Sequence, residues 1–292
     1  MKQVAILTMD SLEDFFAYDT MLDEPMRAAG WQTTHVPWRD ESVDWNQFDV
    51  VIVRSPWDYQ QAADQFIACL QRIEVSSAVL ENPYSLMVWN IDKQYLRDLS
   101  AASVPIVPTL WKDHYEAEML VQGFAQFETD TVIVKPTISA NADDTFQIKQ
   151  GEQDEFASTL AKLFASRPLM IQPFLPAVLS PGEFSLFYFN HRYSHAILKT
   201  PKSGDFRVQE EHGGQLRSIE PSEQMRRVAE HTLAALPTKS LYARVDLIDL
   251  SGGSDENFAV MEVELIEPSL YFNMDTGSAQ RFVDQFLARF DT

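Results

Sequence analysis

The chain has 292 residues, 45% of them hydrophobic and 23% charged, which is typical of a globular protein with a large buried core and room for about two domains. A net charge of −20 argues against a nucleic-acid or anionic-membrane surface, because both partners require a positive field. The single cysteine, Cys69, excludes an intrachain disulfide and fits a reducing cytoplasm, and we expect it to be a buried thiol. The first residues contain too short an apolar run for a signal peptide, and no transmembrane segment is evident.

The first part of the chain alternates strand and helix patterns. Strands are expected at Val4–Thr8, Gln32–Pro37, Phe48–Arg54 and Ala78–Leu80, and helices around Thr20–Gly30 and Ala62–Glu74. This alternation predicts an open parallel sheet, in which ligands bind beyond the carboxyl ends of the strands. One such end carries four candidate substrate-binding residues, Ser55, Trp57, Asp58 and Tyr59. The alternative is a proline-containing loop packed by aromatic rings.

After a break at Asn82-Pro83-Tyr84, the pattern becomes mixed. A helix is expected over Val88–Leu99, with Lys93 in its first turns, and a short strand is expected between Pro105 and Pro108. Helices are then expected at Tyr115–Phe124 and Asp154–Ser166. A strand hairpin is expected from Thr131–Lys135 and Phe146–Lys149, and a further strand at Leu169–Phe174. This order predicts an α+β unit.

The last third of the chain is predicted to be mainly antiparallel. Glu183–Phe189 and Tyr193–Lys199 are expected to pair, and a flexible segment with Lys202, Arg207 and Glu210–Gly214 follows them. Helices are expected at about Ser222–Ala235 and Ser278–Phe290.

Between these two helices lies an acid-rich hairpin, with strands over residues 242–250 and 258–266 and a turn-rich connector at Ser251–Asn257. Alternation predicts a core-facing set of Val245, Leu247, Met261, Val263 and Leu265. The opposite face then carries Arg244, Asp246, Glu262 and Glu264. Like charges on adjacent strands repel, and a divalent cation such as Mg²⁺ would explain why these carboxylates are kept together. A solvated, charged sheet face is the alternative.

Several motifs follow one another in the order and approximate spacing of one superfamily. They are Lys93, Val134-Lys135-Pro136, Gln172-Pro173-Phe174-Leu175, Glu183 and Glu262-Val-Glu-Leu-Ile-Glu267-Pro268. In these residues, which span essentially the whole chain, the sequence resembles the ATP-grasp superfamily. Together with Arg54-Ser-Pro-Trp-Asp-Tyr59, they look like its glutathione-synthetase-like branch, which includes the cyclo-ligase that closes O-ureido-D-serine to D-cycloserine.

The resemblance implies an α/β fold of the ATP-grasp type. An N-terminal, open parallel-sheet domain on the substrate side would cover residues 1–86. Two ATP-grasp subdomains, a central one over residues 87–172 and a C-terminal one with the metal-binding hairpin over residues 173–292, would enclose a nucleotide cleft.

The resemblance also implies roles for individual residues. ATP would be bound by Lys93, Lys135, Gln172, Phe174, Leu175 and Glu183. The adenine would lie against the strand Leu169–Leu175, the hinge between the two ATP-grasp subdomains, and the ribose hydroxyls would lie at Glu183. One or two Mg²⁺ ions, or Mn²⁺, would be held by Asp246, Glu262 and Glu264. Lys199, Arg207 and Arg244 would act on the terminal phosphate and the reacting carbonyl. Glu267 either contacts the substrate or closes the edge of the site.

The implied reaction forms a carbon–nitrogen bond at the expense of ATP. A small amino-acid-like or peptide-like acid would attack the γ-phosphoryl group to give an acylphosphate, and an amine would then displace phosphate. A cytoplasmic location is expected from the cysteine content, and a homodimer, which is common among relatives, is suggested by analogy alone. Two other functions compete: a non-catalytic ATP-binding sensor or partner protein, and a metal-dependent hydrolase that uses the same acids but leaves Lys93 and Lys135 without a role.

Two departures from the family pattern bear on the site. Residues 137–145 contain no glycine, whereas many relatives have a glycine-rich phosphate lid there, so it is open whether this loop closes over the phosphates. Glu264 stands where many relatives have asparagine, and it adds a negative charge to the metal site.

Overall fold

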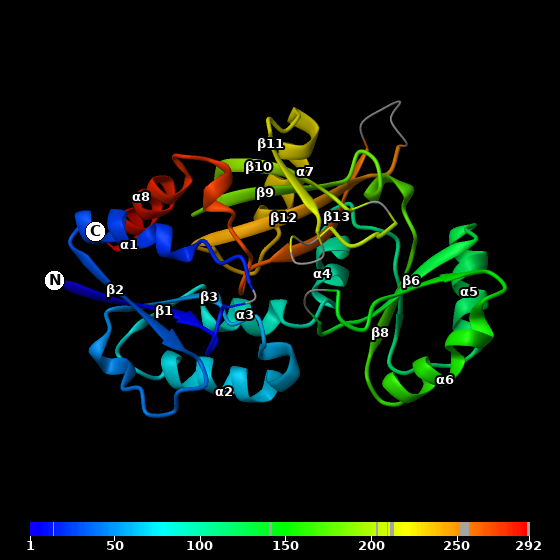
Figure 1. The fold of residues 1–292 in the computed structure, drawn as a ribbon, viewed down its shortest axis with the longest axis horizontal. Coiled ribbons are helices and arrows are strands. Elements are labelled where there is room, and N and C mark those ends of the chain that lie inside the picture. The colour runs from blue at the N-terminus through cyan, green and yellow to red at the C-terminus, as the bar shows by residue number, and fades with distance from the viewer. Residues whose placement is uncertain are drawn as a thin grey trace.

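Three β-sheets organise the molecule, and helices pack against each of them (Figure 1). The computed structural model describes residues 1–13, 15–139, 142–202, 204–208, 210, 213–251 and 257–290. The N-terminal sheet and the middle sheet lie toward opposite ends of the long axis, and the third sheet lies above and between them (Figure 1). Among the described residues, no helix combines the length and the apolar character needed to cross a bilayer.

The first sheet is parallel, as the alternation predicts, with the strand order β2-β1-β3-β4. Its strands are β1 (Lys2–Thr8), β2 (Trp31–Pro37), β3 (Val50–Ser55) and β4 (Val79–Glu81), and its helices are α1 (Asp23–Ala28) and α2 (Ala63–Glu74). Alternate side chains of β1 and β3 serve two cores, so that Ala5 and Val51 pack with α2 while Val4 and Ile52 pack on the other face. Cys69 on α2 is a buried free thiol, as expected.

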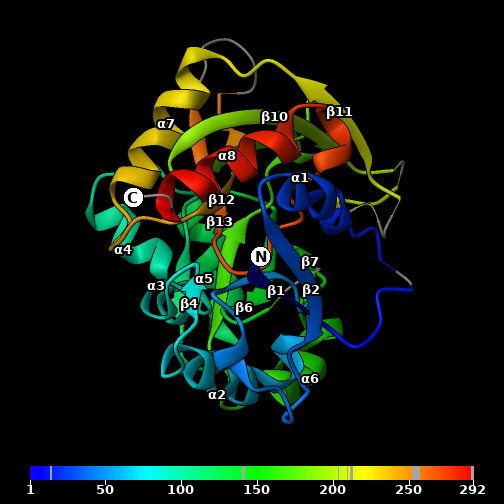
Figure 2. The ribbon, with the colours of Figure 1, turned by 90° about the vertical axis from the view of Figure 1, so that its left-hand side faces the viewer.

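The second face of this sheet is covered by the C-terminal helix α8 (Ser278–Phe290) together with α1. Phe282 and Phe286 of α8 are fully buried in the same core as Val4 and Ile52. Figure 2 looks onto this end of the molecule, where α8 and α1 lie beside each other. The end of the chain therefore returns to stabilise its beginning. Short 3-10 helices interrupt the loops at Asp19–Leu22, Trp45–Gln47, Tyr59–Ala62 and Phe272–Met274.

The middle sheet is antiparallel, with the order β5-β8-β6-β7. Its elements are β5 (Leu110–Lys112), α5 (Glu118–Phe127), β6 (Thr131–Pro136), β7 (Phe146–Lys149), α6 (Gln153–Leu163) and β8 (Leu169–Pro173). Val132 and Val134 of β6 pack against α5 and α6, so the alternate residues Ile133 and Lys135 point away from that core. A loop with the 3-10 helix Pro176–Val178 leads from β8 to the third sheet.

The third sheet is antiparallel, with the order β11-β10-β9-β12-β13. Its elements are β9 (Glu183–Phe189), β10 (Arg192–Thr200), β11 (Gln215–Ile219), α7 (Glu223–Ala234), β12 (Tyr242–Asp249) and β13 (Phe258–Glu264). One face packs on α7. On the other face, β9 changes character along its length, because Phe187 and Phe189 join the core of α8 whereas Glu183 and Ser185 lie where that core ends. A polar pocket begins at that point.

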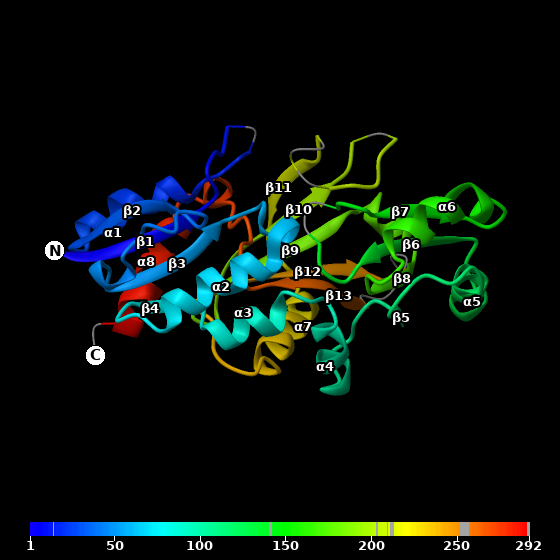
Figure 3. The same ribbon diagram turned by 90° about the horizontal axis from the view of Figure 1, so that it is seen from below.

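Side chains from two helices cover the outer edge of β13, which would otherwise be an exposed sheet edge. These helices are α3 (Tyr84–Asn90) and α4 (Tyr95–Ala101), which follow α2 along the underside of the molecule (Figure 3). The Tyr95 hydroxyl donates to the Val263 carbonyl and accepts from the Val263 amide, at 3.0 and 2.7 Å. The Asn90 amide donates to the same carbonyl, and its oxygen accepts from the Leu265 amide. The strand that carries Glu262 and Glu264 is thus fixed from outside.

The prediction of one helix over Val88–Leu99 is wrong, because the chain forms two helices with Lys93 in the connection between them. The Asp92 carboxylate accepts from the Gln94 amide at 2.9 Å, and the Lys93 amide donates to the Thr137 carbonyl at 2.8 Å. Both contacts draw the backbone out of the helical hydrogen-bond pattern. Lys93 is consequently held by a turn rather than by a helix.

Three further expectations for strands need correction. No strand lies between Pro105 and Pro108, where Ile106 forms only an isolated bridge to Val260, and β5 begins two residues later. The strand β11 was not expected, because its pattern is weak and its side chains are largely exposed. Met261 does not join the core between the third sheet and α7, because a β-bulge aligns Asp246 with Glu262 but Leu247 with Val260. Val260 occupies the core position instead.

Candidate functional site

One pocket gathers residues from the middle sheet, the third sheet and the segment that follows β3 of the N-terminal sheet. The wall formed by the middle sheet and the following loop consists of Ile133, Lys135, Gln172, Pro173, Phe174, Leu175 and Val178. The floor formed by the third sheet consists of Glu183, Lys199, Arg244, Asp246, Met261, Glu262 and Glu264. The wall on the side of the N-terminal sheet consists of Trp57, Tyr59, Ile91, Glu267, Ser269 and Tyr271. Lys93 and Arg207 also line the pocket.

The middle-sheet wall is largely apolar. Leu175, Val178 and Met261 pack, partly buried, around a small core of Val107 and its neighbours. The buried Gln172 side chain donates to the Thr109 hydroxyl at 2.9 Å. The Phe174 amide donates to the Thr131 carbonyl at 2.9 Å, which ties this loop to β6. A flat apolar ring would fit between such surfaces.

Lys135 differs from the other cations of the pocket. Among the described residues, no carboxylate lies within ion-pair distance of its ammonium group. Burial lowers the pKa of Lys135, which Glu262 opposes and the nearby Lys93 reinforces. Two lysines that face one cavity fit a multiply charged anion such as a phosphate chain.

Lys93 is buried and already engaged. Its ammonium group donates to the Ser139 carbonyl at 2.6 Å and lies 3.0 Å from Glu262. Ser139, Ala142 and Thr145 of the glycine-free loop also line the pocket. Residues 140 and 141 of that loop lie outside the described residues, as do residues 252–256 of the hairpin connector.

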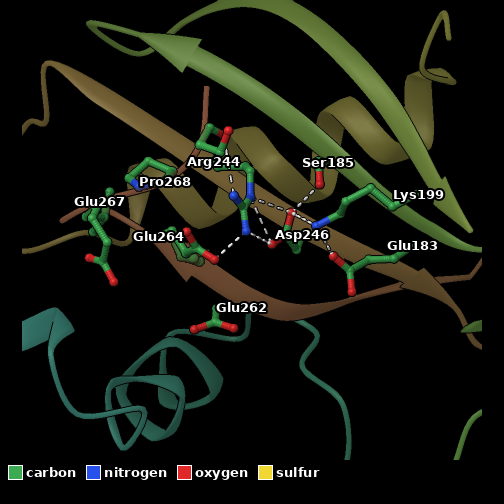
Figure 4. A network of polar contacts seen from close by, with 12 residues as sticks. Glu183, Ser185, Lys199, Arg244, Asp246, Glu262, Glu264, Glu267 and Pro268 are labelled. Atoms are coloured by element: carbon green, nitrogen blue, oxygen red, sulfur yellow. Dashed lines mark hydrogen bonds and ion pairs between the residues drawn. The ribbon is translucent and has the colours of Figure 1, made fainter. Parts of the chain in front are cut away.

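The floor of the pocket is a chain of buried ion pairs (Figure 4). Lys199 pairs with Glu183 and lies 3.5 Å from Asp246, whose other partners are the Ser185 hydroxyl at 2.5 Å and the Arg244 guanidinium at 2.9 Å. Burial lowers the pKa of Lys199, but Asp246 and Glu183 outweigh it, so the net shift is upward. Burial raises the pKa of Asp246, yet Arg244 and Lys199 prevail and the net shift is downward. Both groups are therefore held in their charged forms.

Arg244 stands between Asp246 and Glu264 and donates to both (Figure 4). Burial raises the pKa of Glu264 to about 8, and Glu262, Asp246 and Glu267 contribute in the same direction although Arg244 opposes them. Arg244 and Asp246 are buried and Glu262 and Glu264 are half-buried, so the predicted charged face of the hairpin is a pocket floor and not a solvated sheet surface. Ser185 was missed, although the alternation from Glu183 places it on this face.

The structure divides the four substrate-binding candidates at the end of β3 and just beyond it. Trp57 and Tyr59 line the pocket, whereas Ser55 and Asp58 do not reach it. The Ser55 hydroxyl is buried against Thr8, and the Asp58 carboxylate accepts from the Trp38 indole and from Arg39, at 2.7 and 2.9 Å. Both carboxylate oxygens of Asp58 are therefore engaged by side chains outside the pocket.

Arg207 lines the pocket from a loop and pairs with its neighbour Asp205, at 2.8 Å. Its guanidinium is 39% exposed, so it is less constrained than Lys199 or Arg244. Residues 211 and 212 of the Glu210–Gly214 segment lie outside the described residues. Tyr271 also lines the pocket, and no sequence pattern pointed to it.

Two parts of the chain match known families. Residues 4–82 match the N-terminal domain of D-cycloserine synthetase DcsG, and residues 111–254 match the ATP-grasp domain of prokaryotic glutathione synthetase. The cycloserine biosynthesis protein DcsG of Streptomyces lavendulae is 31% identical over 279 residues, which is 91% of each protein. The chain belongs to the ATP-grasp ligase family. Within it, the resemblance to the D-cycloserine synthetase branch is confirmed.

Solved structures agree with this assignment. The crystal structure of D-cycloserine synthetase DcsG superposes with a TM-score of 0.87 at 30% identity, over 98% of this chain and 99% of that one. An ATP-grasp ligase, PsnB, complexed with its minimal precursor, Mg and ADP, has a TM-score of 0.66 at 15% identity, over 99% of this chain and 98% of that one, which shows a shared fold. The expected ATP-grasp fold is therefore confirmed, and the protein is an ATP-dependent ligase of the kind that forms carbon–nitrogen bonds.

The acids of the ATP-grasp floor fit Mg²⁺ that arrives with the nucleotide. Asp246 and Glu262 lie opposite each other on β12 and β13 and offer carboxylate oxygens, which this ion prefers. Burial raises the pKa of Glu264, as do the nearby Glu262, Asp246 and Glu267, and a divalent cation would favour its charged form. In the described part of the chain, no three histidine, cysteine or acidic side chains are placed to hold a metal by themselves. Phosphate oxygens would therefore have to complete the coordination.

Proposed function

We propose that this protein is a Mg-ATP-dependent ligase that activates a small, amino-acid-like carboxylate as an acylphosphate and joins it to an amine. The observation that carries the proposal is the order of groups in one pocket: an apolar wall, the lysine pair Lys135 and Lys93, and a floor of buried carboxylates and cations. The similarity to D-cycloserine synthetase supports a small amino-acid-like acid.

The residues suggest a division of labour. The adenine would lie against Phe174 and Leu175, and Lys135 and Lys93 would hold the phosphates from the middle-sheet side. Asp246, Glu262 and Glu264 would bind Mg²⁺, which supplies charge neutralisation at the phosphates when it is bound.

The chemistry itself needs little from the side chains beyond position and charge. The substrate carboxylate oxygen forms a bond to the γ-phosphorus while the bond to ADP breaks. The amine nitrogen then bonds to the acyl carbon, inorganic phosphate departs, and the amine loses a proton. Arg244 and Lys199 would stabilise the negative charge that develops on the transferred phosphoryl group and on the carbonyl. Arg207, on its exposed loop, would reach the terminal phosphate from the open side.

A hydrolase that uses the same acids has less support. Arg244 separates Asp246 from Glu264, and Lys93 engages Glu262, so the carboxylates are matched with cations before any ligand binds. Such a floor is suited to a nucleotide phosphate chain that brings its own metal ion. It is less suited to the metal ion and activated water that a hydrolase would need.

The proposal is tested by phosphate and ADP release from Mg-ATP with a panel of acids and hydroxylamine as the amine, which converts an acylphosphate to a hydroxamate. The panel includes O-ureido-D-serine. Acid-dependent ADP release with hydroxamate formation is the expected result, and ATP binding without turnover of any acid would contradict it in favour of a sensor.

Lys135→Gln provides the residue-level test. Because a charge-assisted contact contributes about 1.5–3 kcal/mol, the KM for Mg-ATP should rise about 10–100-fold. The matched control is Lys149→Gln, since Lys149 is an exposed lysine on the neighbouring strand β7. Equal KM values for the two variants would remove Lys135 from the nucleotide site.

A further inference from the structure

The loop that follows β13 is held by an unusual set of contacts. Each of its six consecutive main-chain carbonyls, from Leu265 to Leu270, lies within hydrogen-bond distance of a side-chain donor elsewhere in the chain. In the order of the carbonyls, these side chains are Asn82, Tyr242, Trp57, Arg54, Arg244 and His195, at 2.6, 2.9, 2.8, 2.5, 3.4 and 3.1 Å. The single proton of the Tyr242 hydroxyl is shared between the Ile266 carbonyl and the nearer Val53 carbonyl, at 2.6 Å. Three donors come from the N-terminal sheet region and three from the third sheet. The backbone of this loop is therefore fixed from two sides.

The fixed backbone presents one ionisable side chain to the pocket. Glu267 is only 9% exposed and lines the pocket on the side of the N-terminal sheet. Figure 4 shows it beyond Glu264, apart from the ion pairs of the floor. In the described part of the chain, no lysine, arginine or histidine lies within ion-pair distance of it. Burial raises the pKa of Glu267 to about 7, and hydrogen bonding from the nearby Tyr59 hydroxyl opposes that shift.

A buried carboxylate that lacks a cation is costly unless a ligand supplies one. The surroundings favour an organic cation. The carboxylate provides a charged acceptor, and the rings of Trp57 and Tyr59 form the adjacent wall, an arrangement that suits an ammonium group. Glu267 takes part in none of the ion pairs of the floor and lies beyond Glu264, the last proposed metal ligand on that side (Figure 4).

We propose that Glu267 and Tyr59 bind the ammonium group of the acid substrate, so that the enzyme selects amino acids over acids that lack an amino group. This inference rests on the proposed ligase function and adds the substrate class to it. The amino group bound here is distinct from the amine that attacks the acylphosphate.

The test uses matched pairs of acids with Mg-ATP and hydroxylamine: O-ureido-D-serine against its desamino analogue, and D-serine against 3-hydroxypropanoate. Wild-type enzyme should prefer the amino member by about 10–100-fold in kcat/KM, the value of one charged hydrogen-bonded contact. In Glu267→Gln, this ratio should fall to about one, mainly through a higher KM for the amino member. Tyr59→Phe should lower the ratio in the same direction but by less.

The controls separate this role from others. Glu41→Gln changes an exposed glutamate far from the pocket and should keep the wild-type preference. Thermal unfolding of each variant checks the fold, and Tyr59→Phe retains the test if Glu267→Gln fails to fold. A loss in kcat that is equal for both members of a pair would indicate a proton-transfer role for Glu267, and a higher KM for Mg-ATP would indicate a metal ligand. Either result overturns the inference.

Two results bear on the proposals differently. If both members of each pair are turned over equally by the wild-type enzyme, the ammonium site is wrong but the ligase function stands. If no acid of either kind supports ADP release, the ligase function and the ammonium site fall together.

Discussion

Single residues of the pocket fall into two electrostatic classes. Lys93, Lys199 and Arg244 are already paired with carboxylates, whereas Lys135 and Glu267 face the cavity without a partner of opposite charge among the described residues. Paired groups hold their geometry before a ligand arrives, and unpaired buried charges are the places where a ligand gains most. Lys135 and Glu267 have opposite signs and come from opposite walls, which matches a phosphate chain and an ammonium group.

His195 is the residue whose protonation should be felt in the stability of the whole fold. It is buried, stacks on Phe187 with ring centroids 4.3 Å apart, and donates through Nε2 to the Leu270 carbonyl. Burial lowers the pKa of His195 from 6.5 to about 4. Since the unfolded chain binds the proton more readily, the contribution of His195 to stability is present above pH 6.5 and is lost as the pH falls toward 4.

We therefore expect His195→Gln to show a smaller loss of unfolding free energy between pH 6.5 and 4 than the wild type, measured by urea denaturation. The comparison between variants is needed because burial raises the pKa of Glu81 to about 7, which contributes the opposite slope between pH 4.5 and 7. His231→Gln, at an exposed histidine of α7, is the matched control. A parallel pH dependence in wild type and His195→Gln would show that His195 titrates alike in both states.

At this scale, the sequence indicated most of the residues that line the pocket but not their partners. Strand alternation was enough to bring Arg244, Asp246, Glu262 and Glu264 to one face, because that periodicity is local. The fate of Asp58 could not be foreseen, since its partners Trp38 and Arg39 lie on another loop and only the folded chain brings them together. The roles assigned by family resemblance stay predictions.

Among the elements, the linker before β9 lies tightly against β10 at Lys199, one of the residues of the pocket floor. Gly182 has a φ of +124°, and a Cβ at this position would lie 2.4 Å from the Lys199 carbonyl oxygen and 2.8 Å from a methyl group of Thr200. Only glycine allows both the conformation and the approach. The linker thereby positions β10 at the residue that pairs with Glu183 and Asp246.

Gly182→Ala should consequently lower both stability and kcat. Gly151→Ala is a well-matched control, because Gly151 also has a positive φ, of +100°, but an added Cβ there would meet no atom within 4 Å. Backbone strain alone should cost about 1–2 kcal/mol in each variant, so the excess loss in Gly182→Ala measures the clash. Urea denaturation and the ADP-release assay provide the two readouts. Equal effects in the two variants would mean that the linker yields without disturbing Lys199.

Element boundaries were predicted well where the pattern is local and failed where another element intervenes. β7 and β9 begin and end at the predicted residues, since each has a strand pattern bounded by turns: β7 alternates apolar and polar residues, and β9 is rich in aromatic residues. The orientation of Met261 was predicted wrongly because of the β-bulge. Beside this bulge, Val260 exchanges backbone hydrogen bonds with Pro105 and Val107, which lie more than 150 residues earlier. No periodicity within the hairpin could indicate an extra residue that a distant segment accommodates.

At the scale of the whole molecule, Asn82 joins the N-terminal sheet to the third sheet. Its amide group donates to the carbonyls of Tyr242 and Leu265, and its oxygen accepts from the amides of Leu241 and Tyr242. The side chain is completely buried. Removal would leave several buried backbone groups without partners, each at a cost of about 1–3 kcal/mol.

We expect Asn82→Ala to lower the free energy of unfolding by about 3 kcal/mol or more, measured by urea denaturation. Asn46→Ala is the control, because Asn46 is exposed and accepts from the Ser77 amide at the surface, so its loss should stay below about 1 kcal/mol. A cost for Asn82→Ala no larger than that of the control would show that the two sheets are held together mainly by their apolar cores.

The type of each sheet and the order of the sheets along the chain were predictable, but the packing of the last helix against the first sheet was not. A parallel first sheet followed by antiparallel units follows from periodicity and loop positions. The return of α8 to the N-terminal sheet does not, because an amphipathic helix does not indicate which of three sheets its apolar face covers.

The backbone of the loop from Leu265 to Leu270 is held by contacts to its carbonyl groups. These contacts do not involve the loop's own side chains, so the backbone conformation does not depend on which side chains the loop carries. Inserting or deleting one residue would move every carbonyl away from its donor, so the loop can tolerate changes of side chain far better than changes of length. Position 267 is therefore a natural place for exchanging one substrate preference for another: a different side chain would be presented at the same point in the pocket, on a backbone that has no reason to move.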